Sequence, residues 1–230
     1  MCYTPLIAIT TAVVEFILAC IMIGVFRKSF FQTLFALFIV LLGTYQFTEF
    51  MLCTSQQPEF WALVGFLTYN FLPALALHGT LRFVGTKIHT LFLYVLPVLF
   101  SLFVLSPEFI REASCNEPFV TVRHLFFQID QGVWPFVYAA YYFGFIITAC
   151  VCTLVAYRQE KNKIKRRIEL LELTGITLMT VPTFVLLFLF PILSIKFPSI
   201  YCHFALALAI MIFVGAYFEN KLPTKKQSRT

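Results

Sequence analysis

Apolar residues along this chain form long continuous runs and do not alternate with polar residues. A helix that crosses a bilayer needs about 20 largely apolar residues, and seven runs are close to this length. They cover Pro5–Phe26, Phe31–Cys53, Phe60–Leu81, Ile88–Leu105, Val133–Tyr157, Leu170–Ile195 and Ser199–Phe218. Continuous runs favour helices over a membrane barrel, whose strands alternate. The pattern predicts an all-α fold: a seven-transmembrane helix bundle, with residues 1–230 as a single membrane domain.

The composition supports this interpretation. Sixty per cent of the residues are hydrophobic and 12% are charged, whereas a soluble domain carries about 25% charged residues. The seven runs leave no room for a separate soluble domain. The first run does not resemble a cleavable signal peptide, because residues 1–4 contain no Lys or Arg.

Positive charge is unevenly distributed between alternate connections. Of the 17 Lys and Arg residues, only Arg111, Arg123 and Lys196 fall on one side of the predicted bundle, which leaves 14 on the other. Cytoplasmic loops are rich in Lys and Arg. The chain is therefore predicted to start outside and to end in the cytosol. The net charge of +6 reflects these loops and does not indicate nucleic-acid binding.

The most basic connection is Arg158–Arg167, which contains six of these cations. Its simplest role is to orient the helices on either side of it. Two other roles stay open: contact with anionic lipid, and contact with a cytoplasmic signalling partner that also reaches the C-terminal tail.

A few polar residues lie inside the apolar runs. Glu15 lies about ten residues into the first run, or ~15 Å deep at 1.5 Å per residue. An ionisable group at that depth is costly and suggests a functional site. It is expected to face the bundle interior, protonated or hydrogen-bonded.

Other polar residues fall in the same outer half. Gln46 and Glu49 lie one helical turn apart, and Tyr45 is four residues from Glu49. Asn70 lies about midway along the third run. We expect these four residues and Glu15 to form one ligand-binding pocket that opens outward, since the inner half of most helices is strongly apolar. The alternative is that they only join helices by hydrogen bonds.

The segment Ser106–Gly132 is the longest connection, on the outer side. Aromatic and β-branched residues at Phe119–Val122 and Leu125–Ile129 suggest a small hairpin that caps the bundle. Cys53 and Cys115 both lie on this side, where a disulfide is stable. They are one possible pair, although Cys2 and Cys202 are also near the outer surface.

The motifs of several enzyme classes are absent from the sequence. It contains no GxSxG, no HExxH and no glycine-rich phosphate loop. The last apolar run has no Lys to hold retinal. The four histidines are not spaced to share a metal on one helix face. No enzyme activity, cofactor or metal is therefore expected.

Several local patterns occur in a recognisable order. The second run closes with small residues and a Glu, in Leu42–Glu49. The third has Trp61 near its outer end, Pro73 within it, and Phe83-Val84-Gly85 at its exit. The basic linker leads into Leu170–Gly175 and then Pro182. Together these features resemble the seven-transmembrane N-terminal sensor region of bacterial membrane histidine kinases.

The resemblance implies a multi-pass protein of the bacterial inner membrane that senses a ligand and signals through its last helix. The chain ends at Thr230, nine residues after Lys221, so a stand-alone form without the kinase part is expected. A pocket so close to lipid suits a small amphipathic or lipid-like molecule. The alternative function is a small-solute membrane transporter or channel, and a scaffold role is the third.

Overall fold

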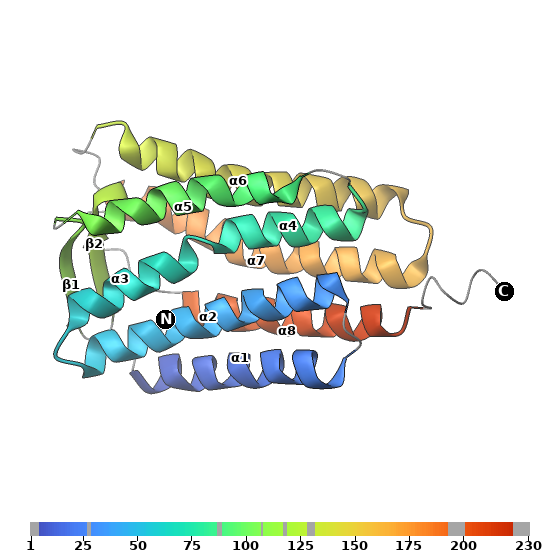
Figure 1. The fold of residues 1–230 in the computed structure, drawn as a ribbon, viewed down its shortest axis with the longest axis horizontal. Helices are drawn as coiled ribbons and strands as arrows, with labels where there is room; N and C mark the ends of the chain where they lie inside the picture. The colour runs from blue at the N-terminus through green and yellow to red at the C-terminus, as the bar shows by residue number, and fades with distance from the viewer. Residues whose placement is uncertain are drawn as a thin grey trace.

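A computed structural model of the chain describes residues 5–26, 29–86, 89–106, 108–116, 119–127, 132–192 and 201–222. In this part of the chain, long helices lie side by side in a bundle, and a two-stranded sheet lies at one end (Figure 1). The helix α1 (Pro5–Val25) packs against α2 (Phe30–Thr54) and α8 (Tyr201–Asn220), while α7 (Lys163–Ile192) packs against α6 (Trp134–Gln159) and α8. The helix α4 (Leu72–Val84) contacts α2 and α6 and thereby completes the bundle.

The first two helices have nearly the predicted bounds. The helix α1 covers Pro5–Val25 and α2 covers Phe30–Thr54. Ser29 begins α2 as its N-cap, because its side chain accepts a hydrogen bond from the backbone N–H of Gln32 at 3.1 Å.

The third apolar run forms two helices, α3 at Pro58–Tyr69 and α4 at Leu72–Val84. The sequence predicts a bend in this run at Pro73. The break falls at residues 70–71 because a proline ring clashes with the carbonyl four residues earlier, here that of Tyr69. The helix α4 ends at Gly85, whose φ of 87° is left-handed.

The fourth run is shorter and only partly α-helical. It contains the 3₁₀ turn η1 at Thr90–Tyr94, the helix α5 at Val95–Leu102 and the 3₁₀ turn η2 at Phe103–Leu105. A 3₁₀ turn rises about 2.0 Å per residue. The 16 residues therefore extend over ~28 Å, close to the ~30 Å of a bilayer core.

The predicted hairpin is present in the outer segment, with a different first strand. The strand β1 covers Ile110–Asn116 and pairs antiparallel with β2 at Phe119–His124; Ser114 lies opposite Thr121. The run that begins at Leu125 forms the 3₁₀ turn η3, Leu125–Phe127, and not a strand. Alternation alone does not reveal which residues pair with Phe119–Val122.

The remaining helices are α6 at Trp134–Gln159, α7 at Lys163–Ile192 and α8 at Tyr201–Asn220. The helix α7 begins seven residues before the predicted apolar run. Its start is fixed by Asn162, whose side-chain oxygen accepts hydrogen bonds from the N–H groups of Ile164 and Lys165 at 2.9 and 3.3 Å. The apolar pattern could not reveal this charged first part of α7.

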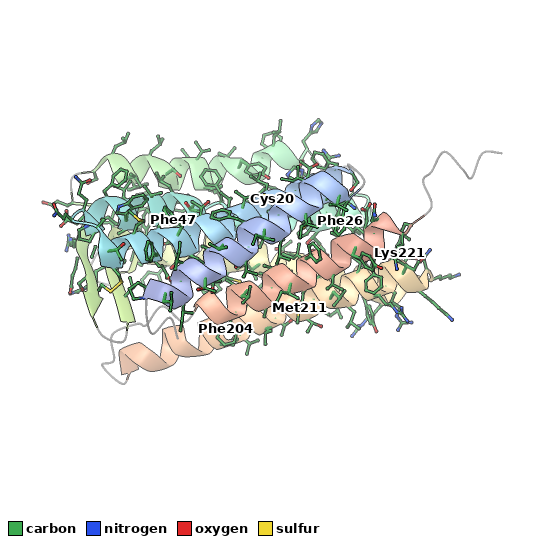
Figure 2. All side chains as sticks on the ribbon, turned by 90° about the horizontal axis from the view of Figure 1, so that it is seen from below. Cys20, Phe26, Phe47, Phe204, Met211 and Lys221 are labelled. Atoms are coloured by element: carbon green, nitrogen blue, oxygen red, sulfur yellow. A yellow bond between two sulfur atoms is a disulfide. The ribbon has the colours of Figure 1, made fainter. Side chains whose placement is uncertain are left out.

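The outer surface of the bundle has the character of a membrane protein. Within the described ranges, four helical segments are long and apolar enough to cross a membrane: Pro5–Val25, Phe30–Thr54, Pro58–Val84 and Trp134–Gln159. Shorter apolar helices cover Thr90–Leu105 and Phe204–Asn220. Large apolar side chains such as Leu91, Phe92 and Leu105 are more than three-quarters exposed. Figure 2 shows side chains projecting from the outside of the helices. A soluble monomer rarely exposes so much apolar surface.

The described cations gather at the ends of the bundle. Figure 1 places the α6–α7 connection and the C-terminal ends of α4 and α8 at one end, and the hairpin with Arg111 and Arg123 at the other. Some cations that the orientation prediction uses lie outside the described residues: Arg27, Lys28, Lys87, Lys196, Lys225, Lys226 and Arg229.

Candidate functional site

Glu15 is the central residue of the candidate site. It belongs to a buried stripe on α1, formed by Ala8, Thr11, Ala12, Glu15, Ala19 and Met22, at the three-to-four residue spacing of one helix face. Glu15 has no exposed surface. Among the described residues, neither of its carboxyl oxygens has a hydrogen-bond partner. The expected orientation toward the interior is therefore observed, and of the two expected states, protonated or hydrogen-bonded, the described residues provide no hydrogen bond.

Packing between α1 and α2 shows which residues lie opposite Glu15. The Phe16 ring lies 3.1 Å from the point that a Cβ on Gly43 would occupy, and Ala8 packs against Phe50. The two helices are thus antiparallel. This register places Gln46 near the height of Glu15.

Glu49 lies about one turn further out than Gln46. Its carboxyl is close enough to act electrostatically on that of Glu15. Gln46 has no exposed surface, and Glu49 is 4% exposed. The structure therefore brings Glu15, Gln46 and Glu49 together at the buried α1–α2 interface.

The contacts described for Tyr45 and Asn70 are with other helices than α1. The Tyr45 ring meets that of Tyr69 on α3 edge-on, with centroids 5.7 Å apart. The Asn70 amide donates to the Pro97 carbonyl at 2.7 Å and to Ser101 Oγ at 3.1 Å, both on α5. The Tyr141 hydroxyl on α6 donates to the Asn70 backbone carbonyl at 2.6 Å.

The Asn70 bonds are of the kind that join helices. They satisfy a carbonyl and hold together the region where α3 and α4 separate. For Asn70 the structure therefore supports the alternative of helix-joining hydrogen bonds, whereas Glu15 has no bond of this type among the described residues.

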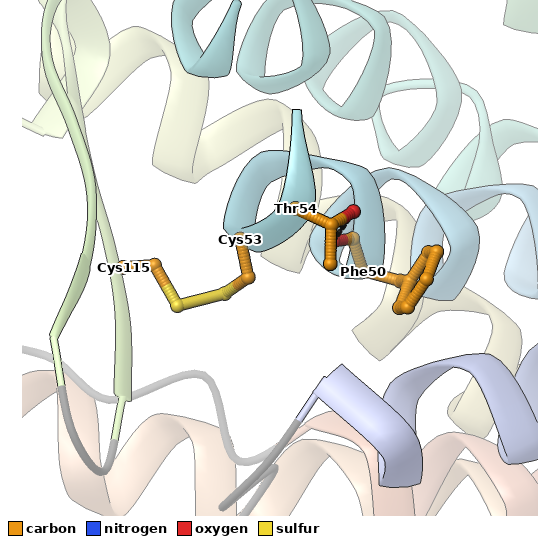
Figure 3. Close-up of a disulfide and its surroundings, with 4 residues drawn as sticks. All are labelled: Phe50, Cys53, Thr54 and Cys115. Atoms are coloured by element: carbon orange, nitrogen blue, oxygen red, sulfur yellow. Dashed lines mark hydrogen bonds between the residues drawn. A yellow bond between two sulfur atoms is a disulfide. The ribbon is translucent and has the colours of Figure 1, made fainter. Parts of the chain in front are cut away.

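A disulfide ties the hairpin to the bundle. Cys53 at the end of α2 is bonded to Cys115 on β1, with the two Cα atoms 5.1 Å apart (Figure 3). This is the pair that the sequence offered as one possibility. Cys2 and the Cys202 side chain, which allowed other pairings, lie outside the described residues.

His124 attaches the hairpin a second time, and the sequence did not indicate this role. Its ring is stacked on Phe109, with centroids 5.5 Å apart, inside an aromatic cluster that includes Phe66 and Phe126. The Phe126 N–H donates to His124 Nδ1 at 3.3 Å, so the ring proton is on Nε2, 2.6 Å from the Tyr69 hydroxyl. Burial lowers the pKa of His124 to about 3. The ring is therefore neutral at physiological pH.

The inner half of the bundle also contains buried polar side chains, although the sequence predicts that the inner half of most helices is strongly apolar. The Thr80 hydroxyl on α4 donates to Glu172 on α7. Gln32 on α2 donates to Glu219 on α8 at 2.6 Å, and Ser29 donates to the same carboxyl oxygen at 3.3 Å. Glu172 and Glu219 were not recognised because the first lies at the very start of the predicted run Leu170–Ile195 and the second lies just beyond the run Ser199–Phe218.

An apolar layer separates the two polar regions along α2. Between Gln32 and Gln46 its buried side chains include Phe35, Phe38, Ile39 and Leu42. Fourteen residues of α-helix correspond to ~21 Å. The buried face of α2 therefore offers no continuous polar path between the two halves.

The structure contains a small cavity of about 40 Å³ in the middle of the bundle. It lies between α2, α4, α6, α7 and α8, and its lining is almost entirely apolar. The residues around it are Phe38, Leu72, Pro73, Ala76, Tyr142, Phe143, Ile146, Ile176, Met179, Thr180 and Leu208. None of the five predicted ligand-binding residues is among them. A cavity of this size with so little polar lining offers too few hydrogen-bond partners to hold water.

Comparison with known proteins identifies the family of this bundle. No curated protein and no solved structure matches the chain. The family model described as the N-terminal 7TM region of histidine kinase matches residues 7–223. This match confirms the resemblance read from the sequence, and it concerns the membrane sensor part of such kinases. The chain belongs to the family of N-terminal seven-transmembrane regions of histidine kinases.

Proposed function

We propose that the chain is a membrane receptor or sensor domain that binds a small amphipathic or lipid-like molecule in its outer half. The observation that carries this proposal is the Glu15 carboxyl, buried without a hydrogen-bond partner among the described residues. Such a group is costly inside a membrane. The polar head of an amphipathic ligand would supply the missing hydrogen bond, while apolar walls hold its chain. Gln46 and Glu49 then complete the polar part of the site.

The proposal includes seven membrane spans, with the N-terminus outside and the C-terminus in the cytosol of a bacterial inner membrane. The ~28 Å length of Thr90–Leu105 supports counting it as a span. The exposed cations of residues 158–167 at the end opposite the hairpin support the orientation.

Topology is testable by labelling single cysteines with a reagent that does not cross membranes. We expect Lys161→Cys, in a variant with the native cysteines replaced, to react only after the membrane is opened. A cysteine in place of exposed Arg111 should react in intact cells. Reaction of the cysteine at position 161 from outside would contradict the orientation.

The output is proposed to leave the bundle through α8, toward a cytoplasmic signalling partner. Glu219 near the end of α8 is bonded to Gln32 and Ser29 at the start of α2, so a shift between α1 and α2 reaches the end of α8 through few contacts. The segments proposed to contact this partner are the C-terminal tail and the basic connection Arg158–Arg167.

A small-solute transporter or channel is the second candidate, because buried polar residues occur in both halves of the bundle. The apolar layer on α2 weighs against it. The test is to identify amphiphiles that co-purify with the protein by mass spectrometry, and to measure uptake of these compounds by proteoliposomes. A bound amphiphile without uptake supports the sensor. Uptake at a rate well above protein-free liposomes would replace the sensor by the transporter.

A further inference from the structure

The connection between α6 and α7 exposes a dense group of positive charges. Residues 158–167 contain six cations and one acid, Glu160, which gives a net charge of +5. Of the six, Arg158, Lys161, Lys163, Arg166 and Arg167 are exposed. Of these six cations, Lys165 is the one that forms an ion pair within the described residues, with Glu160 at 3.8 Å. Most of the charge is therefore available to an external anion.

The local structure holds this group in place. The Arg166 guanidinium lies over the Tyr157 ring, 4.7 Å from its centroid, and donates to the Tyr157 hydroxyl at 3.4 Å. The first N–H groups of α7 are occupied by the Asn162 side chain. The arginine and lysine side chains, and not the helix N-terminus, are thus the groups that an anion would contact.

The exposed faces of both helices show how deep these cations lie. On α7 the exposed residues change from cationic Arg166 and Arg167 to apolar Leu170, one turn further along. On α6 the exposed Val155 is followed by exposed Arg158. The change from apolar to cationic exposure occurs at the boundary between acyl chains and headgroups. Both helices therefore place their cations at the height of lipid phosphates.

We infer that the connection 158–167 binds the headgroups of anionic phospholipids on the cytoplasmic leaflet. This interaction is separate from the ligand proposed near Glu15 and does not depend on it. The orientation of the protein in the membrane depends only on how many cations lie on each side, and not on where their side chains are held. Their fixed placement beside the apolar belt favours lipid over a protein partner. Arginine also matches phosphate oxygens with two parallel donors.

The test uses the whole protein reconstituted in nanodiscs with equal amounts of phosphatidylglycerol and phosphatidylcholine. Native mass spectrometry then counts the lipids that remain bound. We expect phosphatidylglycerol to be retained in clear excess by the wild type. Each cation near an anionic surface favours association about fivefold, so a triple variant, Arg158→Gln, Arg166→Gln and Arg167→Gln, should lower this preference at least ~10-fold.

The matched control is Arg111→Gln with Arg123→Gln, which removes two exposed cations from the opposite end and should leave the preference unchanged. If the triple variant does not fold, raising the salt concentration on the wild type replaces it and should also reduce the preference. Equal retention of the two lipids by the wild type would overturn the inference and leave the connection to a protein partner. The inference would also be overturned if the triple variant preferred phosphatidylglycerol as strongly as the wild type does.

Discussion

Replacing Glu15 by Leu is expected to stabilise the protein without ligand and to remove its response to ligand. Glu15 is fully buried, and its oxygens have no described hydrogen-bond partner. A buried polar group without a partner costs about 1–3 kcal/mol, and an apolar residue of similar size avoids this cost. We therefore expect the free energy of unfolding of Glu15→Leu to rise by up to ~2 kcal/mol. Thermal unfolding in detergent measures it.

The ligand response is measured in the same experiment by adding a lipid extract of the expressing cells. The wild type should be stabilised by the extract, whereas Glu15→Leu should not. Glu15→Gln keeps a polar side chain at the site and should retain part of the response with little gain in stability. Val13→Leu adds the same residue on the half-exposed face of α1 and should change neither quantity.

The result distinguishes the two interpretations of the outer polar residues. A loss of stability in Glu15→Leu would mean that the carboxyl joins helices, as Asn70 does through Pro97 and Ser101. A gain in stability with loss of response is the trade-off expected at a binding site. Asn70 itself is expected to matter for folding and not for ligand binding.

The positions of the helices were largely predictable because apolar runs report directly on spanning segments. For α1 and α2 the predicted bounds are within about one residue of those observed. The prediction was less accurate where geometry departs from a regular α-helix. The bend predicted at Pro73 takes the form of a short interruption between α3 and α4 at residues 70–71, and Thr90–Leu105 reaches its length through 3₁₀ turns.

The candidate site was only partly predictable. Position along a helix gives the depth of a residue but not the neighbour that it faces, so Asn70 was grouped with Glu15 although its bonds lead to α5 and α6. The spacing of Gln46 and Glu49 on one helix face was a better guide, because their place opposite Glu15 follows from simple antiparallel packing.

Several bonds were missed because their partners are distant in sequence. Tyr69 and His124 are 55 positions apart, and Gln32 and Glu219 are 187 apart. Helix periodicity reports on neighbours within one or two turns and not on such pairs. A disulfide is more predictable, because a cysteine pair needs only two residues of one kind on the same side of the membrane.

Removing the disulfide, with Cys53→Ser and Cys115→Ser together, is expected to loosen the hairpin without unfolding the bundle. The bond closes a segment of 62 residues, and for a soluble chain a loop of that length corresponds to about 4 kcal/mol of stabilisation. Here the helices between the two cysteines remain in the membrane when tertiary contacts are lost. The unfolded state is already restricted, so a loss of ~2 kcal/mol is expected. The hairpin keeps its attachment through His124 and Tyr69.

The double variant should therefore melt a few degrees lower and be cleaved faster by a protease added outside, with cleavage confined to residues 106–132. Reduction of the wild type should reproduce this sensitivity. Cys20→Ala, which removes a free cysteine exposed on α1, is the control and should behave as the wild type. If the double variant matches the wild type in melting and in protease resistance, the aromatic cluster around His124 and Phe66 holds the hairpin by itself, and the disulfide adds nothing to its attachment.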